Sequence, residues 1–130
     1  KMANKGRPKN NLNSPLFSIA THKDHVLIAG GGGGKNYGLS NTLKVYKNQF
    51  PLGEPVQVED FDTELMSHLQ FAYNNLDYFV AAISKSVAIY QINPKSGEIS
   101  KISSEEADFH EKEPEVAKAR WSQDNKFIVC

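Results

Sequence analysis

From position 16 onward the sequence consists of short apolar runs separated by Gly, Asn, Asp, Pro and Ser, and no window keeps apolar residues at helical spacing. The runs are rich in Val, Ile, Phe and Tyr, which suit the pleated surface of a β-sheet. The pattern therefore predicts an all-β chain. The ten expected strands are 16–20, 25–29, 42–47, 55–59, 68–72, 78–83, 86–92, 99–103, 117–121 and 126–130.

Eight of these strands form two groups of four, and the second group repeats the first. Residues 43–46 correspond to residues 87–90, and residues 69–71 correspond to residues 119–121 about fifty positions later, which is close to the length of one β-propeller blade. Residues 121–129 resemble the first hairpin of a WD-repeat blade. In each group the second strand is the most continuously apolar and the fourth alternates. This predicts a second strand covered on both faces and a fourth strand with one face in solvent.

The repeat predicts an incomplete, WD-repeat-like β-propeller at residues 16–130, preceded by a flexible basic tail at residues 1–15. We expect the first blade at 16–62, the second at 65–110 and the start of a third at 116–130. Because a propeller ring typically closes with four to eight blades, we expect the chain to be the N-terminal portion of a longer fold. A sandwich or barrel of ten strands is the alternative, but it leaves the repeat unexplained.

Composition and motifs narrow the classes of function. Fifteen Lys and Arg balance fifteen Asp and Glu, so the overall charge does not indicate binding to nucleic acid or to an anionic membrane. The single cysteine, Cys130, excludes an internal disulfide framework and favours a reducing compartment. No stretch approaches the ~20 apolar residues of a membrane span, so we expect this portion to be soluble. No local arrangement of Ser, His and an acid resembles a known nucleophile motif, so a classical enzyme is not expected.

Three further features have simple structural interpretations. His22 and His25 have the spacing of metal ligands but no cysteine nearby, which favours a surface turn over a zinc site. The acidic segment 105–115 is expected to be a solvated loop between blades, with Phe109 as an alternative partner-docking residue. Trp121 is expected in the core between blades, because aromatic side chains commonly fill propeller interiors.

A run of five glycines begins an unusually long connection between the second and third strands. Because glycine loses the most backbone entropy on folding, the run indicates a need for positive φ angles or for bare backbone. The run consists of Gly30, Gly31, Gly32, Gly33 and Gly34.

Three kinds of loop would account for this run. A phosphate-binding loop is excluded because Ala29 stands where glycine is required and Asn36 stands where Ser or Thr is required; a dinucleotide-binding motif is excluded in every register, and no helix follows. A flexible surface loop remains open. So does a loop whose glycine carbonyls hold a weakly hydrated cation such as potassium. Calcium is not expected, since no carboxylate lies between Ala29 and Asn48.

The sequence Ala-Gly-Gly-Gly-Gly, a Gly-Leu-Ser-Asn segment ending at Asn41, and the strand Thr-Leu-Lys-Val that follows carry a resemblance to a known family. Residues 15–46 are similar to the first blade of the endoplasmic-reticulum WD-repeat guanine-nucleotide exchange factors for Sar-type GTPases. This chain departs from the family pattern by a fifth glycine, Gly34, and by Lys-Asn-Tyr before Gly38.

The resemblance implies a seven-bladed propeller on the cytosolic face of the endoplasmic reticulum, anchored by a membrane helix beyond Cys130. Such a factor promotes GDP release from a Sar-family small GTPase and so starts coat protein complex II vesicle formation, without covalent chemistry. Carried over to this sequence, the GTPase-contacting residues are Gly38, Leu39 and Asn41, with Asn41 either touching the GTPase or bracing the loop. A potassium ion held by the carbonyls of residues 30–34 would order the loop.

Two other classes stay open. A non-catalytic WD-repeat scaffold would bind proteins or peptides without potassium-dependent loop order or GDP release. A small independent β domain would fold from residues 16–130 alone as a monomer.

Overall fold

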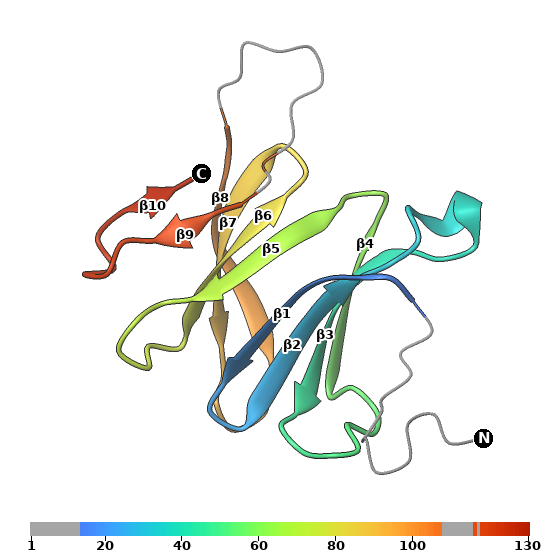
Figure 1. Cartoon of the computed structure of the whole chain (residues 1–130), viewed down its shortest axis with the longest axis horizontal. Coiled ribbons are helices and arrows are strands. Elements are labelled where there is room, and N and C mark those ends of the chain that lie inside the picture. Colours follow the sequence, from blue (N-terminus) through green and yellow to red (C-terminus); the bar gives the residue numbers. More distant parts are fainter. Residues whose placement is uncertain (1–13, 108–115, 117) are drawn as a thin grey trace, which may run out of the picture.

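The structure is a computed structural model of the chain and describes residues 14–107, 116 and 118–130. Within these residues it contains ten β-strands, one short 3₁₀-helix and no α-helix (Figure 1). The elements are β1 (Leu16–His22), β2 (His25–Gly30), η1 (Lys35–Tyr37), β3 (Asn41–Lys47), β4 (Gln57–Asp62), β5 (Met66–Phe71), β6 (Tyr78–Ile83), β7 (Ser86–Ile92), β8 (Ile99–Glu106), β9 (Arg120–Trp121) and β10 (Ile128–Val129). None of the described residues forms a helix long and apolar enough to cross a membrane.

The strands form two four-stranded sheets and one hairpin. The first sheet has the order β1-β2-β3-β4, the second has the order β5-β6-β7-β8, and β9 pairs with β10. Every pairing is antiparallel, which confirms the expected all-β class. Most of the expected tail, together with Phe109 and most of the acidic segment, lies outside the described residues.

Most strand bounds agree with the sequence pattern, and β6 and β7 agree at both ends. The pattern placed the fourth strand at 55–59, whereas β4 begins at Gln57 and continues to Asp62. It continues because Phe61, on the face opposite to Val58, packs its side chain against the core. The burial expected of the second strands is confirmed, since every residue of β2 and all but the first of β6 are buried. Among the fourth strands, β4 alternates as expected, but the expectation is wrong for β8, which is exposed on both faces after Ile99.

An apolar layer between the two sheets forms the main core. Leu27 and Leu43 of the first sheet face Leu69, Phe79 and Tyr90 of the second, and all five side chains are buried. The rings of Phe79 and Tyr90 stack with centroids 5.1 Å apart. Burial raises the pKa of Tyr90 to about 12, so its phenol stays neutral within this layer.

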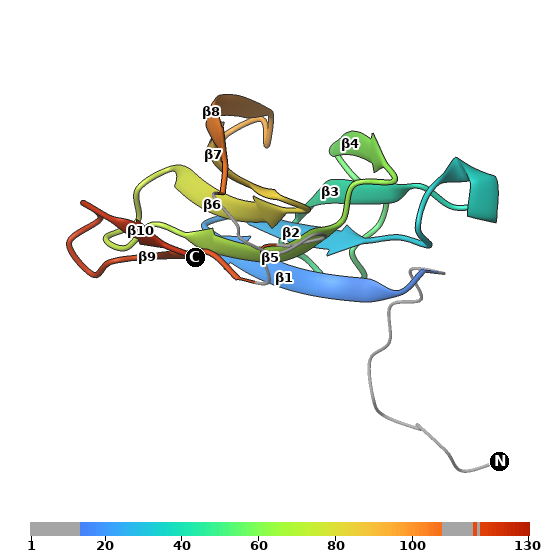
Figure 2. The same cartoon turned by 90° about the horizontal axis from the view of Figure 1, so that it is seen from above.

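β1 and β5, the first strands of the two four-stranded sheets, lie side by side, whereas the last strands, β4 and β8, lie apart from each other (Figure 2). The backbone N–H of Leu69 in β5 donates to Ser18 Oγ in β1, and the N–H of Trp121 in β9 donates to Gln70 Oε1 in β5. Each bond spans 51 positions. Successive units of the sequence repeat therefore pack on one another through similar contacts between their first strands.

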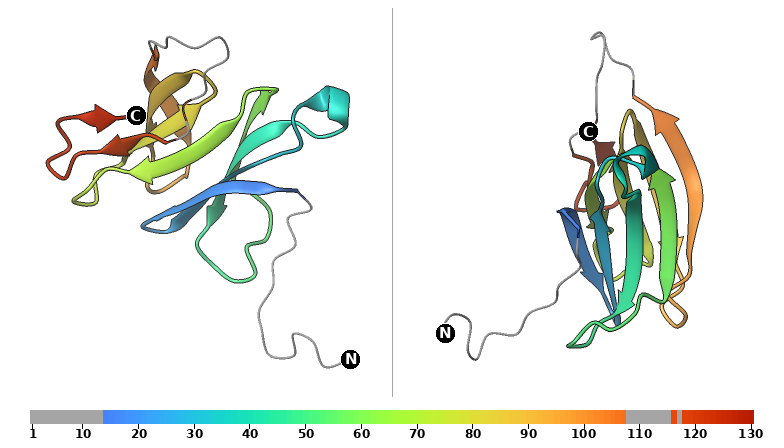
Figure 3. Two further views of the ribbon diagram at one scale, coloured as in Figure 1. Left: turned by 45° about the horizontal axis from the view of Figure 1, so that its top comes forward. Right: turned by 90° about the vertical axis from the view of Figure 1, so that its right-hand side faces the viewer.

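The hairpin β9–β10 continues this arrangement on the side of β5 away from β1 (Figure 3). Val80 and Ala82 of β6 form a second buried cluster with Ala119, and Trp121 packs against it partly buried. This confirms the expected core position of Trp121. The second sheet is therefore covered on both faces near its inner strands.

The layer between the sheets predicts a large effect of truncating one of its side chains. We expect Leu69→Ala to lower the free energy of unfolding by about 2–5 kcal/mol, because it removes buried methyl groups and leaves a cavity. Ile19→Ala in β1 is the matched control: its side chain is exposed, so we expect a change within about 0.5 kcal/mol. Urea unfolding monitored by Trp121 fluorescence measures both. Equal losses in the two variants would contradict this packing.

Candidate functional site

The glycine loop, residues 31–40, connects β2 to β3 and projects from the end of the first sheet (Figure 1). It is folded as a narrow extension of these two strands, and an isolated antiparallel bridge joins Gly34 to Leu39. The 3₁₀-helix η1 forms its tip, and Gly38 ends η1 with a φ of +86°. A glycine suits this position because a side chain disfavours that conformation.

Hydrogen bonds hold most of the loop backbone. Six loop N–H groups donate to backbone carbonyls, and two more, those of Gly33 and Lys35, donate to side chains. The loop therefore has a defined backbone shape rather than the character of an unrestrained surface loop. The six donors to backbone carbonyls are Gly31, Gly32, Gly34, Tyr37, Gly38 and Leu39.

Asn41 holds the base of the glycine loop. It is only 3% exposed, and its Oδ1 accepts a hydrogen bond from the N–H of Gly33 at 3.2 Å. A Cβ atom on Gly31, whose φ is +151°, would lie 2.5 Å from Asn41 Oδ1, so no larger residue fits there. Of the two roles that the sequence left open for Asn41, the geometry is that of a brace.

The end of β4 holds the tip of the loop. Asp62 Oδ1 accepts the N–H of Lys35 at 2.9 Å, and Asp60 Oδ2 lies 3.7 Å from Lys35 Nζ. The pKa of Asp60 is lowered from its ordinary value, chiefly because its carboxylate accepts the N–H of Asp62, with the charge of Lys35 adding to the effect. Gly34 also lies against Thr63. These contacts show that carboxylates do approach the loop, although none lies near it in sequence.

Sequence reasoning missed both aspartates because they follow the glycine run by more than twenty positions. The antiparallel pairing of β3 with β4 places Asp62 opposite Asn41 and Asp60 opposite Thr42. Predicting the antiparallel pairing of the third and fourth strands, together with its register, would have placed the end of the fourth strand beside the start of the third.

The predicted contact residues are brought together but differ in accessibility. Gly38 is exposed and Leu39 is 40% exposed, so both are available to a partner. Asn41 is buried and is therefore not accessible to a partner. Tyr37, which was not among the predicted contact residues, is the most exposed large hydrophobic side chain of the tip at 80%.

The carbonyl groups of the glycine run differ in their hydrogen bonding. The carbonyl of Gly34 already accepts the N–H groups of Tyr37 and Leu39, and Gly30 lies within β2. The carbonyls of Gly31, Gly32 and Gly33 accept no hydrogen bond from the described residues. Neutral carbonyl oxygens suit potassium. Among the described residues no group of three His, Cys, Asp or Glu side chains is placed to hold a metal ion.

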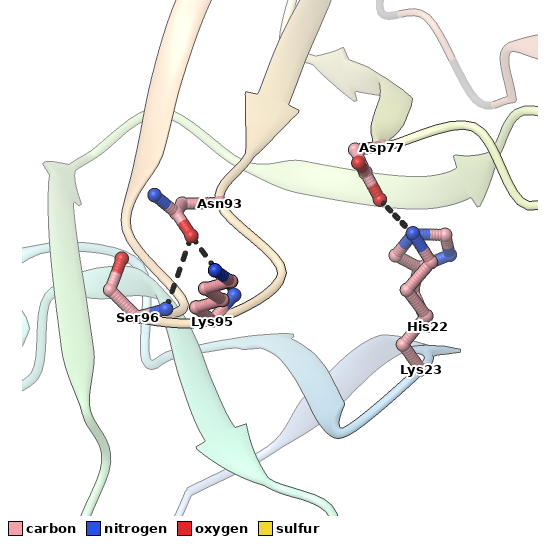
Figure 4. Close-up of polar contacts among 6 residues, drawn as sticks. All are labelled: His22, Lys23, Asp77, Asn93, Lys95 and Ser96. Atoms are coloured by element: carbon pink, nitrogen blue, oxygen red, sulfur yellow. Dashed lines mark hydrogen bonds and ion pairs between the residues drawn. The ribbon is translucent and has the colours of Figure 1, made fainter.

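A second polar cluster joins the two sheets near the β1–β2 turn (Figure 4). His22 Nε2 and Asp77 Oδ1 lie 2.8 Å apart, and Lys23 Nζ donates to the same oxygen at 2.7 Å. The His22 ring stacks on Phe71 with centroids 4.5 Å apart. The pKa of Asp77 is lowered from its ordinary value, first by its hydrogen bond with His22 and then by that with Lys23.

The expectation that His22 and His25 lie in a surface turn is wrong for both rings, which are buried. They are covered by the second sheet: His22 by Phe71 and Asp77, and His25 by the turn containing Gly97.

A depression of about 560 Å³ beside Asp77 is lined mostly by exposed polar side chains. One of these, Asn93, accepts the N–H groups of Lys95 and Ser96 and so closes the β7–β8 turn (Figure 4). The arrangement is that of a link between sheets.

The sequence matches no protein-family model and none of the curated proteins with which it was compared. The glycine loop combines a hydrogen-bonded backbone, three carbonyls that accept no hydrogen bond from the described residues, and an exposed tip.

The link at Asp77 makes stability depend on pH. Because its pKa is lower in the folded than in the unfolded chain, Asp77 stabilises the fold above the unfolded value of about 4, and this contribution disappears as pH falls through the folded value. We expect Asp77→Asn to lower Tm near neutral pH, and the difference in Tm between the variant and the unmodified chain to shrink as the pH falls below about 4. Asp24→Asn, on the neighbouring turn, is the control and should show no such difference. Thermal unfolding measured from neutral to acidic pH tests this prediction. A difference in Tm that does not change with pH would contradict the role of the Asp77 charge.

Proposed function

We propose that this chain is part of a WD-repeat-like β-propeller that promotes GDP release from a Sar-family small GTPase at the cytosolic face of the endoplasmic reticulum. The observation that carries the proposal is the glycine loop, which resembles the loop of such exchange factors and is held by its own hydrogen bonds while Leu39 faces solvent. A held loop that presents an apolar side chain suits insertion into a partner.

The propeller part of the proposal is supported by the stacking of the sheets. The two four-stranded meanders would be blades at 16–62 and 65–110, and residues 116–130 would begin a third of an expected seven. In the first sheet, the row containing Ile19 and Val58 faces away from the second sheet, and both side chains are exposed. The blade that completes the ring would pack on this row, so the remainder of the same propeller is one partner of the chain.

Exchange needs no covalent chemistry in this mechanism. A factor that binds the nucleotide-free GTPase more tightly than the GDP form shifts the population toward release. Gly38 and Leu39 would contact the GTPase beside its nucleotide site. Asn41 would act through Gly33, since it is buried and fixes the loop that carries these two residues.

The proposal includes a potassium ion that stabilises the glycine loop. The carbonyls of Gly31, Gly32 and Gly33 would hold it, because the described structure leaves them without hydrogen bonds. A bound cation would supply a positive charge that neutralises the mutual repulsion of these carbonyl dipoles. Asn41 and Asp62 hold the loop from its base and tip whether or not the ion is bound.

The burial of Asn41 also favours a second candidate, a WD-repeat scaffold that binds proteins or peptides without promoting exchange. The resemblance gives Asn41 a central place in exchange, but its side chain is directed to the loop and not to solvent. In a scaffold the same hydrogen bond would simply stabilise a surface loop. The two candidates differ in one measurable property, the acceleration of GDP release.

The test is GDP release from a purified Sar-family GTPase loaded with fluorescent GDP, in potassium and in sodium buffer. We expect the full chain to accelerate release, with faster release in potassium. Asn41→Ala should slow it by about tenfold, the effect of about 1.4 kcal/mol, because Gly33 loses its hydrogen-bond acceptor.

Asn48→Ala is the matched control for this experiment. Asn48 is exposed but follows the end of β3 that lies away from the glycine loop, so we expect release within about twofold of the unmodified chain. Circular dichroism establishes that each variant keeps its β-sheet signal. Release no faster than from the GTPase alone, by a folded chain, would exclude the exchange factor and leave the scaffold.

A further inference from the structure

Tyr37 has an unusual combination of exposure and position. At 80% it is the most exposed large hydrophobic side chain of the described residues, ahead of Val129 at 68% and Phe127 at 67%. It lies in η1 at the tip of the glycine loop, the part of the loop farthest from β2 and β3. Leaving an aromatic ring of this size in water has no evident benefit for the fold.

The backbone beneath Tyr37 is held on both sides. Its own N–H donates to the carbonyl of Gly34 at 3.0 Å, and the N–H of Gly38 donates to the carbonyl of Lys35 at 2.9 Å. The Asp62 carboxylate fixes Lys35 from outside the loop. An exposed side chain on a fixed backbone loses little conformational freedom when it binds, so more of its contact energy remains as affinity.

The neighbours of Tyr37 define the shape that a partner must have. Leu39 is exposed on the same tip, and Gly38 between them has no side chain. Apart from these two neighbours, no atom lies within 4 Å of the place where a Cβ of Gly38 would stand. The tip therefore presents an aromatic ring and an aliphatic side chain on either side of a glycine. An apolar recess with a polar rim on a protein surface is complementary to this shape, and tyrosine is enriched among residues that dominate such interfaces.

The charges around the tip favour a protein over a lipid surface. Lys35 is the one base of the glycine loop, and Asp60 and Asp62 lie beside it. Membrane-surface elements instead combine apolar side chains with several bases on the same face. A tip whose one base lies beside two carboxylates does not have that composition.

We propose that Tyr37 is the anchor residue of the loop, and that its ring inserts into an apolar recess of the GTPase partner. This inference rests on the function proposed above and adds to it the residue that supplies most of the binding energy. Leu39 packs beside the ring, whereas Asn41 and Asp62 act only as positioning residues. The phenolic hydroxyl remains at the polar rim of the recess.

The experiment measures binding of the full chain to a nucleotide-free Sar-family GTPase by biolayer interferometry, together with its effect on GDP release. We expect Tyr37→Ala to weaken binding by about tenfold or more and to slow release in proportion. Tyr37→Phe should stay within about threefold, because the ring is retained. Phe127→Ala, which removes an equally large exposed ring at the β9–β10 turn, should leave both quantities unchanged.

Each result decides one question. If the unmodified chain promotes release and Tyr37→Ala equals it, the anchor role is overturned while the exchange function stands. If the folded, unmodified chain neither binds the GTPase nor promotes release, the proposed function is overturned and the anchor role falls with it. If Tyr37→Ala loses binding to vesicles of phosphatidylcholine and phosphatidylserine but not to the GTPase, Tyr37 is a membrane contact and the inference is wrong.

Discussion

The apolar layer between the two sheets is the interaction on which the rest of the structure depends. Leu27 and Leu43 meet Leu69 and Phe79 there, out of contact with water. This burial sets β1 beside β5, and only then can polar groups such as His22 and Asp77 reach each other across the junction. It also fixes β2 and β3, the two strands from which the glycine loop projects, so loop geometry follows from sheet packing.

Much of the fold could be predicted because its signals are local. β6 (Tyr78–Ile83) and β7 (Ser86–Ile92) are bounded by turn residues on each side, and both were predicted at their observed bounds. The start of the fourth strand was misplaced because Val56 continues the alternation of Val58 with polar residues, whereas β4 begins at Gln57. The burial of His22 and His25 could not be predicted, since their covering residues come from the second sheet, at least 49 positions away. No sequence window contains that information.

The candidate site, like the fold, could be predicted from the sequence only in part. The glycine run itself marked the loop, and its costly composition correctly indicated a close backbone approach, which Gly31 makes to Asn41. The brace from Asp62 depends on the register of β4 against β3, which the run does not encode. Tyr37 stood in the sequence only as a departure from a family pattern. Its exposure became evident once the backbone of the tip was known.

The central claim is that the glycine loop is held in one shape by Asn41 and Asp62, and amide hydrogen exchange tests it most directly. The account predicts slow exchange at Gly33 and Lys35, whose N–H groups donate to these side chains, and fast exchange at Asn36, whose N–H has no acceptor among the described residues. In Asn41→Ala, exchange should accelerate at Gly33 and stay slow at Lys35. Exchange at Gly33 and Lys35 as fast as at Asn36 in the unmodified chain would contradict the account.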